Sequence, residues 1–274
     1  QLLIATMYKT IITIISFLIS VTFFTSMTEA KVKKEKKKAI VIHTPEPDPF
    51  INIHKDTKLS QSPMAYQQSK KFANSFKGGI DVSHYQGNID WTRISKSGNI
   101  SYAFVKATES NYYIDDFYNF NIEEGKKNGI AMGSYHFFRA NVSMLEQFEH
   151  MTSIIEPGMQ DLIPLIDVEA ANGVPADVFA NRLKEFLKMV EDYYGCPPIL
   201  YTYVNFYNKY LAYKGFDRYP LMIAFYNEKI PSISDGHKYI MWQYTCRGRI
   251  DGIKGDVDCS KFMNGASLYD ILYK

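Results

Sequence analysis

The sequence predicts an α/β fold, a TIM-like β/α barrel with eight strands and fewer than eight helices. Strand-like apolar runs alternate with helix-like segments, which is typical of a parallel sheet covered by helices. Late in the chain the spacing shortens, so that little room for a helix separates residues 227 and 239, or 245 and 257. An open doubly wound sheet is the alternative. No glycine-rich phosphate loop follows any strand, which weakens the dinucleotide-binding form of that alternative.

Residues 1–30 have the features of a secretory signal peptide. Lys9 precedes the apolar run 11–24, and the polar stretch after it ends at Ala30, a small residue before a cleavage point. The run is short for a membrane-spanning helix, which needs about 20 residues. The alternative is an uncleaved N-terminal anchor, which would tether the protein to the membrane through residues 9–30. Either form places the chain outside the cytoplasm, secreted or in the periplasm or cell envelope.

Residues 31–78 read as a linker. Its first part, KVKKEKKK at 31–38, holds six lysines and one glutamate, a net +5, so a chain of net charge +2 carries about −3 elsewhere. This balance gives no reason to expect a nucleic-acid partner. The stretch HTPEPDPF has prolines at alternate positions and favours extended backbone.

Residues 79–274 form one predicted domain. Its strand-like runs are 79–83, 102–108, 130–138, 162–170, 198–204, 220–227 and 239–245, and an eighth strand is expected around Asp256 and Asp258. The clearest helix covers 176–195, where apolar residues recur every three or four positions and Gly195 supplies the stop. A second helix opens with Ser143 and Glu146 in capping-box register.

Polar side chains collect at the carboxyl ends of these strands, which in a β/α barrel face one shared mouth. The first strand ends at Asp81, the fourth at Asp167 and Glu169, and the last at Asp258. Other strand ends supply aromatic and amide side chains: Tyr135, Tyr201, Trp242 and Gln243. Acids from three strands with aromatic residues between them predict a substrate cleft.

Asp167 and Glu169 are two residues apart, so their side chains point to the same face with Cα atoms about 6.5–7 Å apart. Two carboxyls this close raise one another's proton affinity, so that one donates a proton while the other remains charged. Cleavage of a glycosidic bond needs this combination. The alternative is that one or both form structural ion pairs with Lys106 or Arg139. An ion pair between Lys106 and Glu109 is expected at the rim.

Several motifs resemble those of the family 25 glycoside hydrolases, the Chalaropsis-type lysozymes. GIDVSHYQGNIDW (79–91) resembles the opening signature, and FVKATE (104–109), GSYHF (133–137), LIDVE (165–169), WQY (242–244) and IDGIKGDVD (250–258) follow in the family's order. The resemblance covers residues 79–264. It implies a modified barrel with fewer helices than strands, and hydrolysis of the β-1,4 bond between N-acetylmuramic acid and N-acetylglucosamine in peptidoglycan.

The resemblance also implies roles for individual residues. Glu169 corresponds to the general acid, and Asp167 to the neighbouring carboxylate that steadies the 2-acetamido group or the cationic transition state. Asp81 and Asp258 correspond to two further acids of the cleft. Sugar binding would fall to the aromatic and amide residues Tyr135, Tyr201, Trp242 and Gln243. His84 either touches substrate or is a loop residue.

The expected partner is the peptidoglycan glycan strand, bound by a monomer without a cofactor or metal. Cys196, Cys246 and Cys259 form at most one disulfide, for which Cys246 and Cys259 are nearest in sequence. Two other functions remain open. One is a non-catalytic glycan-binding barrel, and the other a chitinase-like hydrolase, although the D-x-x-D-x-D-x-E run usual in that class is absent.

Overall fold

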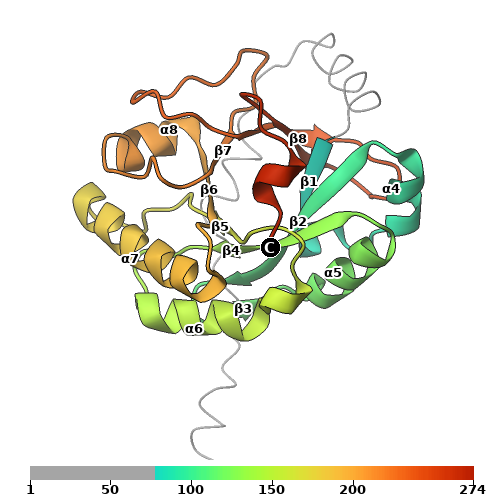
Figure 1. Cartoon of the computed structure of the whole chain (residues 1–274), viewed down its shortest axis with the longest axis horizontal. Coiled ribbons are helices and arrows are strands. Elements are labelled where there is room, and N and C mark those ends of the chain that lie inside the picture. The colour runs from blue at the N-terminus through green and yellow to red at the C-terminus, as the bar shows by residue number, and fades with distance from the viewer. Residues whose placement is uncertain (1–77) are drawn as a thin grey trace, which may run out of the picture. The chain divides into compact units, whose positions relative to one another are not determined.

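The computed structural model describes residues 78–274, in which eight strands close into one barrel (Figure 1). The strands are β1 (Gly78–Val82), β2 (Ile100–Glu109), β4 (Ala131–Phe137), β5 (Leu165–Asp167), β6 (Ile199–Tyr203), β7 (Leu221–Ala224), β8 (Met241–Gly248) and β9 (Val257–Phe262). Their order is β1-β2-β4-β5-β6-β7-β8-β9, and β9 returns to β1. All neighbours are parallel except β9, which is antiparallel to both β8 and β1. The closure confirms the predicted barrel and excludes the open sheet.

Helices lie around the outside of the barrel (Figure 1). Within the described residues they are α4 (Trp91–Ser97), α5 (Tyr118–Lys127), α6 (Met144–Ile154), α7 (Ala176–Tyr194) and the single turn α8 (Val204–Phe206). No helix of this part of the chain separates β7 from β8 or β8 from β9. The short late spacing in the sequence therefore predicted the missing helices correctly.

The ends of the two predicted helices follow the expected local chemistry. Gly195 closes α7 with φ 71°, a left-handed conformation that glycine adopts without steric cost. The Ser143 hydroxyl accepts a hydrogen bond from the Glu146 N–H at the start of α6. A short strand, β3 (Tyr113–Ile114), pairs with the end of β2 and extends the barrel rim.

The fourth barrel strand is shorter than the predicted run 162–170. Pro164 has no N–H to give to a strand ladder, and its carbonyl accepts from the Ile199 N–H at 2.9 Å. Before it, the Ile163 N–H donates to the Ile271 carbonyl at 2.9 Å instead of to a neighbouring strand. β5 therefore covers only Leu165–Asp167.

Apolar side chains form two cores, one on each face of the barrel wall. Along β2, Ala103 and Val105 belong to the outer core, which lies between the barrel wall and the helices. Tyr102 and Phe104 belong to the inner core, which lies inside the barrel. This alternation is the period-two pattern of a strand with both faces buried. The C-terminal segment, red in Figure 1, covers the end of the barrel at which the strands begin, and its Ile271 is fully buried in the inner core.

We predict that Ile271→Ala lowers the free energy of unfolding by about 2–5 kcal/mol, because it leaves a cavity in the inner core. Ile230→Ala is the matched control, since Ile230 is 67% exposed, and we expect a change of about 0.5 kcal/mol or less. Urea unfolding followed by circular dichroism measures both. Equal effects of the two substitutions would contradict the assignment of Ile271 to the core.

The predicted signal peptide or anchor of residues 1–30, and the linker up to residue 77, lie outside the described residues. Across residues 78–274, no helix has the length and apolar character needed to span a membrane. Cys196, Cys246 and Cys259 are all free thiols, so the one disulfide that the sequence allowed, Cys246–Cys259, is not formed.

Candidate active site at the barrel mouth

The acids predicted from strand ends meet where the parallel strands finish. Asp81 and Asp258 are directly opposite each other in the antiparallel pairing of β1 with β9. Asp167 is the register partner of Tyr201 on the neighbouring strand. Ile80 and Val82 belong to the outer core, and adjacent strand residues face opposite sides, so Asp81 faces the barrel interior.

Gln243 is the hub of a hydrogen-bond network at the mouth. Its Nε2 donates to Asp81 Oδ2 at 2.7 Å, and its Oε1 accepts from the hydroxyls of Tyr201 at 2.8 Å and Tyr226 at 2.6 Å. Because Gln243 is buried, both ends of its amide need these partners. The network holds one carboxylate and two phenol rings in fixed positions.

Tyr226 is a site residue that the sequence-based assignment missed. It follows β7, at the same kind of strand end as Tyr135 and Tyr201, but the sequence-based assignment gave it no role.

Burial dominates the electrostatics of Asp81. Loss of solvent raises the pKa of this carboxyl to about 7, although the hydrogen bond from Gln243 lowers it in part. Its Oδ1 is buried without a hydrogen-bond partner. Asp81 therefore carries its proton in part at neutral pH.

We predict that Asp81→Asn stabilises the folded protein at pH 8 but not at pH 4. The folded-state pKa is about 7, above the ordinary value of 3.8, so Asp81 costs stability progressively as the pH rises from 3.8 to about 7. An amide does not ionise, and its oxygen still accepts from Gln243. Urea midpoints of the two proteins at both pH values measure the difference, and a difference that does not change with pH would contradict the pKa of Asp81.

The pKa of Asp167 is raised by two causes. Burial raises it well above the ordinary range, and the charge of Glu169 raises it further, while the charges of Lys106 and Arg139 lower it in part. Its Oδ1 is buried and has no hydrogen-bond partner. The raised pKa favours the protonated form of Asp167 in the substrate-free site, whereas the predicted role of Asp167 is to hold the charge of the pair during the reaction.

Asp258 completes the acidic group. Burial raises its pKa well above the ordinary value, and the charges of Asp81, Glu169 and Asp256 act in the same direction. The pKa of Asp258 therefore depends on the protonation of Asp81 and Glu169. Burial favours the protonated forms of the carboxyls at the mouth, as acid catalysis requires.

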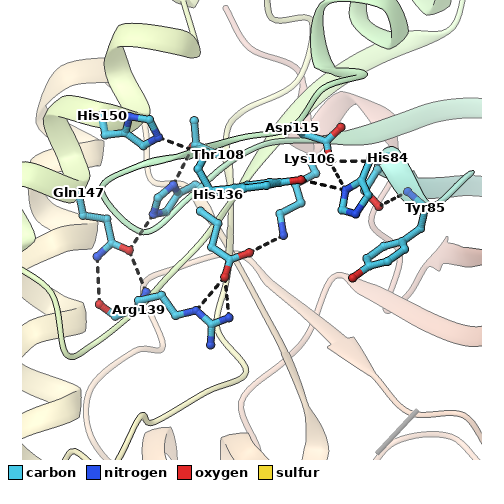
Figure 2. A network of polar contacts seen from close by, with 12 residues as sticks. His84, Tyr85, Lys106, Thr108, Asp115, His136, Arg139, Gln147 and His150 are labelled. Carbon is cyan, nitrogen blue, oxygen red and sulfur yellow. Dashed lines mark hydrogen bonds and ion pairs between the residues drawn. The ribbon is translucent and has the colours of Figure 1, made fainter. Parts of the chain in front are cut away.

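The two cations beside this group share one carboxylate. Lys106 Nζ lies 2.6 Å from Glu109 Oε2, and Arg139 contacts Glu109 Oε1 through Nη2 at 2.6 Å and Nε at 3.0 Å (Figure 2). Burial opposes ionisation of Glu109, but the two cations outweigh it and lower its pKa. The Lys106–Glu109 pair at the rim confirms the sequence prediction.

Behind Arg139, the His136 imidazole is fully buried and has a partner at each nitrogen. Its Nδ1 lies 2.8 Å from Thr108 Oγ1 and its Nε2 2.9 Å from Gln147 Oε1. The same Gln147 oxygen accepts from the Arg139 N–H at 2.8 Å (Figure 2). Burial lowers the pKa of His136 to about 3, so this ring is neutral and supports the backbone of Arg139 rather than transferring protons.

Two of the predicted sugar-binding residues differ in their placement. Tyr135 lies among the acids, since Asp167 and Asp258 both contribute to the rise in its pKa after burial. Trp242 lies on the opposite face of β8 from Gln243, in the outer core, and its Nε1 donates to the Phe225 carbonyl at 2.9 Å. The structure therefore does not bring Trp242 to the acidic group.

The chain is similar to known proteins in both sequence and fold. The profile described as "Glycosyl hydrolases family 25" matches residues 80–253. Lysozyme M1 of Streptomyces globisporus is 30% identical over 203 residues, which are 69% of this chain and 68% of that protein. The lysozyme structure from Streptomyces coelicolor has a TM-score of 0.65 and 28% identity, over 72% of this chain and 95% of that one. A family 25 glycosyl hydrolase structure from Bacillus anthracis has a TM-score of 0.64 and 30% identity, over 71% and 91%.

Proposed function

Because the chain belongs to glycosyl hydrolase family 25, we propose that Glu169 and Asp167 carry its reaction at the barrel mouth. The protein is a glycoside hydrolase of the lysozyme type, an N-acetylmuramidase that acts on peptidoglycan. It cleaves the β-1,4 bond between N-acetylmuramic acid and N-acetylglucosamine. The observation that supports these two residues is the raised pKa of buried Asp167 next to Glu169.

The exposure of the two carboxyls indicates which of them donates the proton. Asp167 is 8% exposed, whereas Glu169 is more accessible, so Glu169 is the carboxyl that a glycosidic oxygen can reach. Glu169 donates its proton to the oxygen of the departing N-acetylglucosamine as the bond to C1 of N-acetylmuramic acid breaks. The pair shares this proton: it passes from Asp167 to Glu169 as the sugar binds, so that Asp167 is ionised when positive charge develops on the muramic acid ring.

We favour retention of configuration through the substrate's own acetamido group. The acetamido oxygen bonds to C1 as the leaving oxygen departs, and Asp167 steadies the positively charged ring that results. Water then adds to C1 as the bond between C1 and the acetamido oxygen breaks, and it gives a proton to Glu169, which restores the acid. Asp81, Asp258 and the Gln243 network with Tyr135 and Tyr201 orient the sugar. The alternative is an inverting attack by water, which proton NMR of the first-formed product anomer distinguishes.

The test of this function is release of muropeptides from purified peptidoglycan by the full chain. We expect soluble products whose new reducing ends are N-acetylmuramic acid, identified by borohydride reduction and mass spectrometry. Reducing ends of N-acetylglucosamine, or release from chitin alone, would favour a chitinase-like hydrolase. Binding to peptidoglycan without release would favour the non-catalytic barrel.

We also propose that the protein acts outside the cytoplasm as a monomer. Lys9, the apolar run 11–24 and Ala30 support a secretory signal. A mature N-terminus at residue 31 would support secretion, and retention of residues 9–30 would support a membrane tether. Mass spectrometry of the protein from the producing cell distinguishes the two, and light scattering of the purified chain tests the monomer.

A further inference from the structure

An exposed aromatic ring lies on the rim of the mouth, on the turn that follows β1. Tyr85 is 65% exposed, and its ring centroid lies 4.1 Å from that of His84. Exposed aromatic rings beside a cleft are frequent contact sites, because they offer a large apolar face at little entropic cost. The Gln243 network and the acidic group use neither ring.

The turn that carries Tyr85 is held on both sides. The Ser83 N–H donates to Gln86 Oε1 at 2.9 Å, and the Tyr85 N–H donates to Ser83 Oγ at 3.3 Å. Gln86 Nε2 also donates to the Asp256 carbonyl at 3.1 Å, two residues before Asp258. The turn is therefore fixed against the segment that leads into β9.

His84 anchors the turn to the hairpin after β2. The His84 N–H donates to Asp115 Oδ2 at 3.0 Å, and His84 Nδ1 lies 2.8 Å from the same oxygen (Figure 2). Asp115 is only 2% exposed, which makes it a firm attachment point. A surface ordered before binding loses little conformational entropy when a ligand arrives.

The Tyr113 side chain is connected to the turn of Tyr85 through His84. The Tyr113 hydroxyl lies 3.1 Å from His84 Nδ1, and Lys106 Nζ lies 5.2 Å from the centroid of the Tyr113 ring. We call Tyr85, His84 and Tyr113 the rim platform. Lys106 also links the platform to the mouth, because it is the register partner of Tyr135 and its charge acts on Asp167.

The charged groups nearest the rings are engaged by neighbours. Asp115 Oδ2 accepts from the His84 N–H, and Lys106 pairs with Glu109, while Asp116, whose charge also acts on Tyr113, is exposed. The platform therefore offers apolar ring faces with hydrogen-bonding edges, and a pyranose ring matches them through its apolar C–H faces and its polar hydroxyls.

We propose that the rim platform is a saccharide subsite that binds a pyranose ring of the glycan strand beyond the two sugars that flank the cleaved bond. This inference rests on the proposed function, since it assumes that the glycan strand runs through the mouth. The continuity of the platform with Asp256 on one side and Lys106 on the other places it along that path.

The test compares Tyr85→Ala with Tyr85→Phe on peptide-free glycan chains of two lengths. Tyr269→Ala is the matched control, because Tyr269 is 80% exposed on the C-terminal segment at the other end of the barrel. We expect Tyr85→Ala to lower kcat/KM on octasaccharides about three- to tenfold, mainly through KM, because one stacked ring is lost. On the shortest cleaved chain it should stay within about twofold of wild type. Tyr85→Phe and Tyr269→Ala should match wild type on both.

Three results would overturn the proposal: an equal loss on short and long chains, no loss on either, or a loss confined to peptidoglycan that keeps its stem peptides. The last would assign the platform to peptide. Affinity for octasaccharides is also measured in a Glu169→Gln background. A weaker affinity on adding Tyr85→Ala would support the subsite even if the wild type cleaved none of these chains, an outcome that would count against the proposed function alone.

Discussion

Glu169→Gln should lower the rate of muropeptide release about 10³-fold, because it removes the proton that the leaving oxygen needs while keeping the shape of the side chain. The initial rate on purified peptidoglycan measures this loss. Glu185→Gln is the matched control, since Glu185 is exposed on α7, away from the mouth. We expect the control to keep the wild-type rate.

A Glu169→Gln variant with wild-type activity would contradict its assignment as the acid. Circular dichroism and the thermal midpoint of the variant are recorded alongside the rate. A loss of rate with a large loss of stability would likewise count against a purely chemical role.

Asp167→Asn should separate activity from stability. We expect release of muropeptides to fall about 10²–10³-fold, mainly in kcat, because the amide cannot take up negative charge opposite the developing cation. At neutral pH the folded protein should become more stable. The pKa of Asp167 is raised in the folded state, so wild type loses stability as the pH rises above the ordinary value of 3.8, and the amide does not.

The check on Asp167→Asn is a pair of urea unfolding curves at pH 4 and pH 8 beside the rate measurement. Asp217→Asn, at an exposed aspartate, is the control and should change neither quantity. A variant less stable than wild type at pH 8 would show that the Asp167 carboxylate contributes to folding. That result would contradict its assignment as a catalytic group whose ionised form lowers the stability of the folded protein.

The sequence predicted the barrel well because two strong signals agreed. Apolar runs located seven of the strands, the eighth was expected around Asp256 and Asp258, and the short spacing after residue 227 located the region without helices. Strand ends were less certain, as the fourth strand shows. Its limits depend on Pro164 and on the distant Ile271 carbonyl, a contact that no local pattern reveals.

The site was predicted by position but not by protonation. Strand ends identified Asp81, Asp167 and Asp258, yet burial raises the pKa values of these carboxyls, and burial is a property of the assembled barrel. Trp242 and Gln243 could not both have faced the mouth, because adjacent residues in a strand point to opposite faces. The alternation alone does not say which of the two faces inward.

The division of roles between the two carboxyls is tested most directly with a disaccharide substrate whose leaving group is dinitrophenolate, which departs without a proton. We predict that Glu169→Gln stays within about tenfold of wild type on this substrate while it loses about 10³-fold on peptidoglycan. Asp167→Asn should lose activity on both. An equal loss of Glu169→Gln on the two substrates would contradict the account in which Glu169 gives the proton and Asp167 takes up the charge.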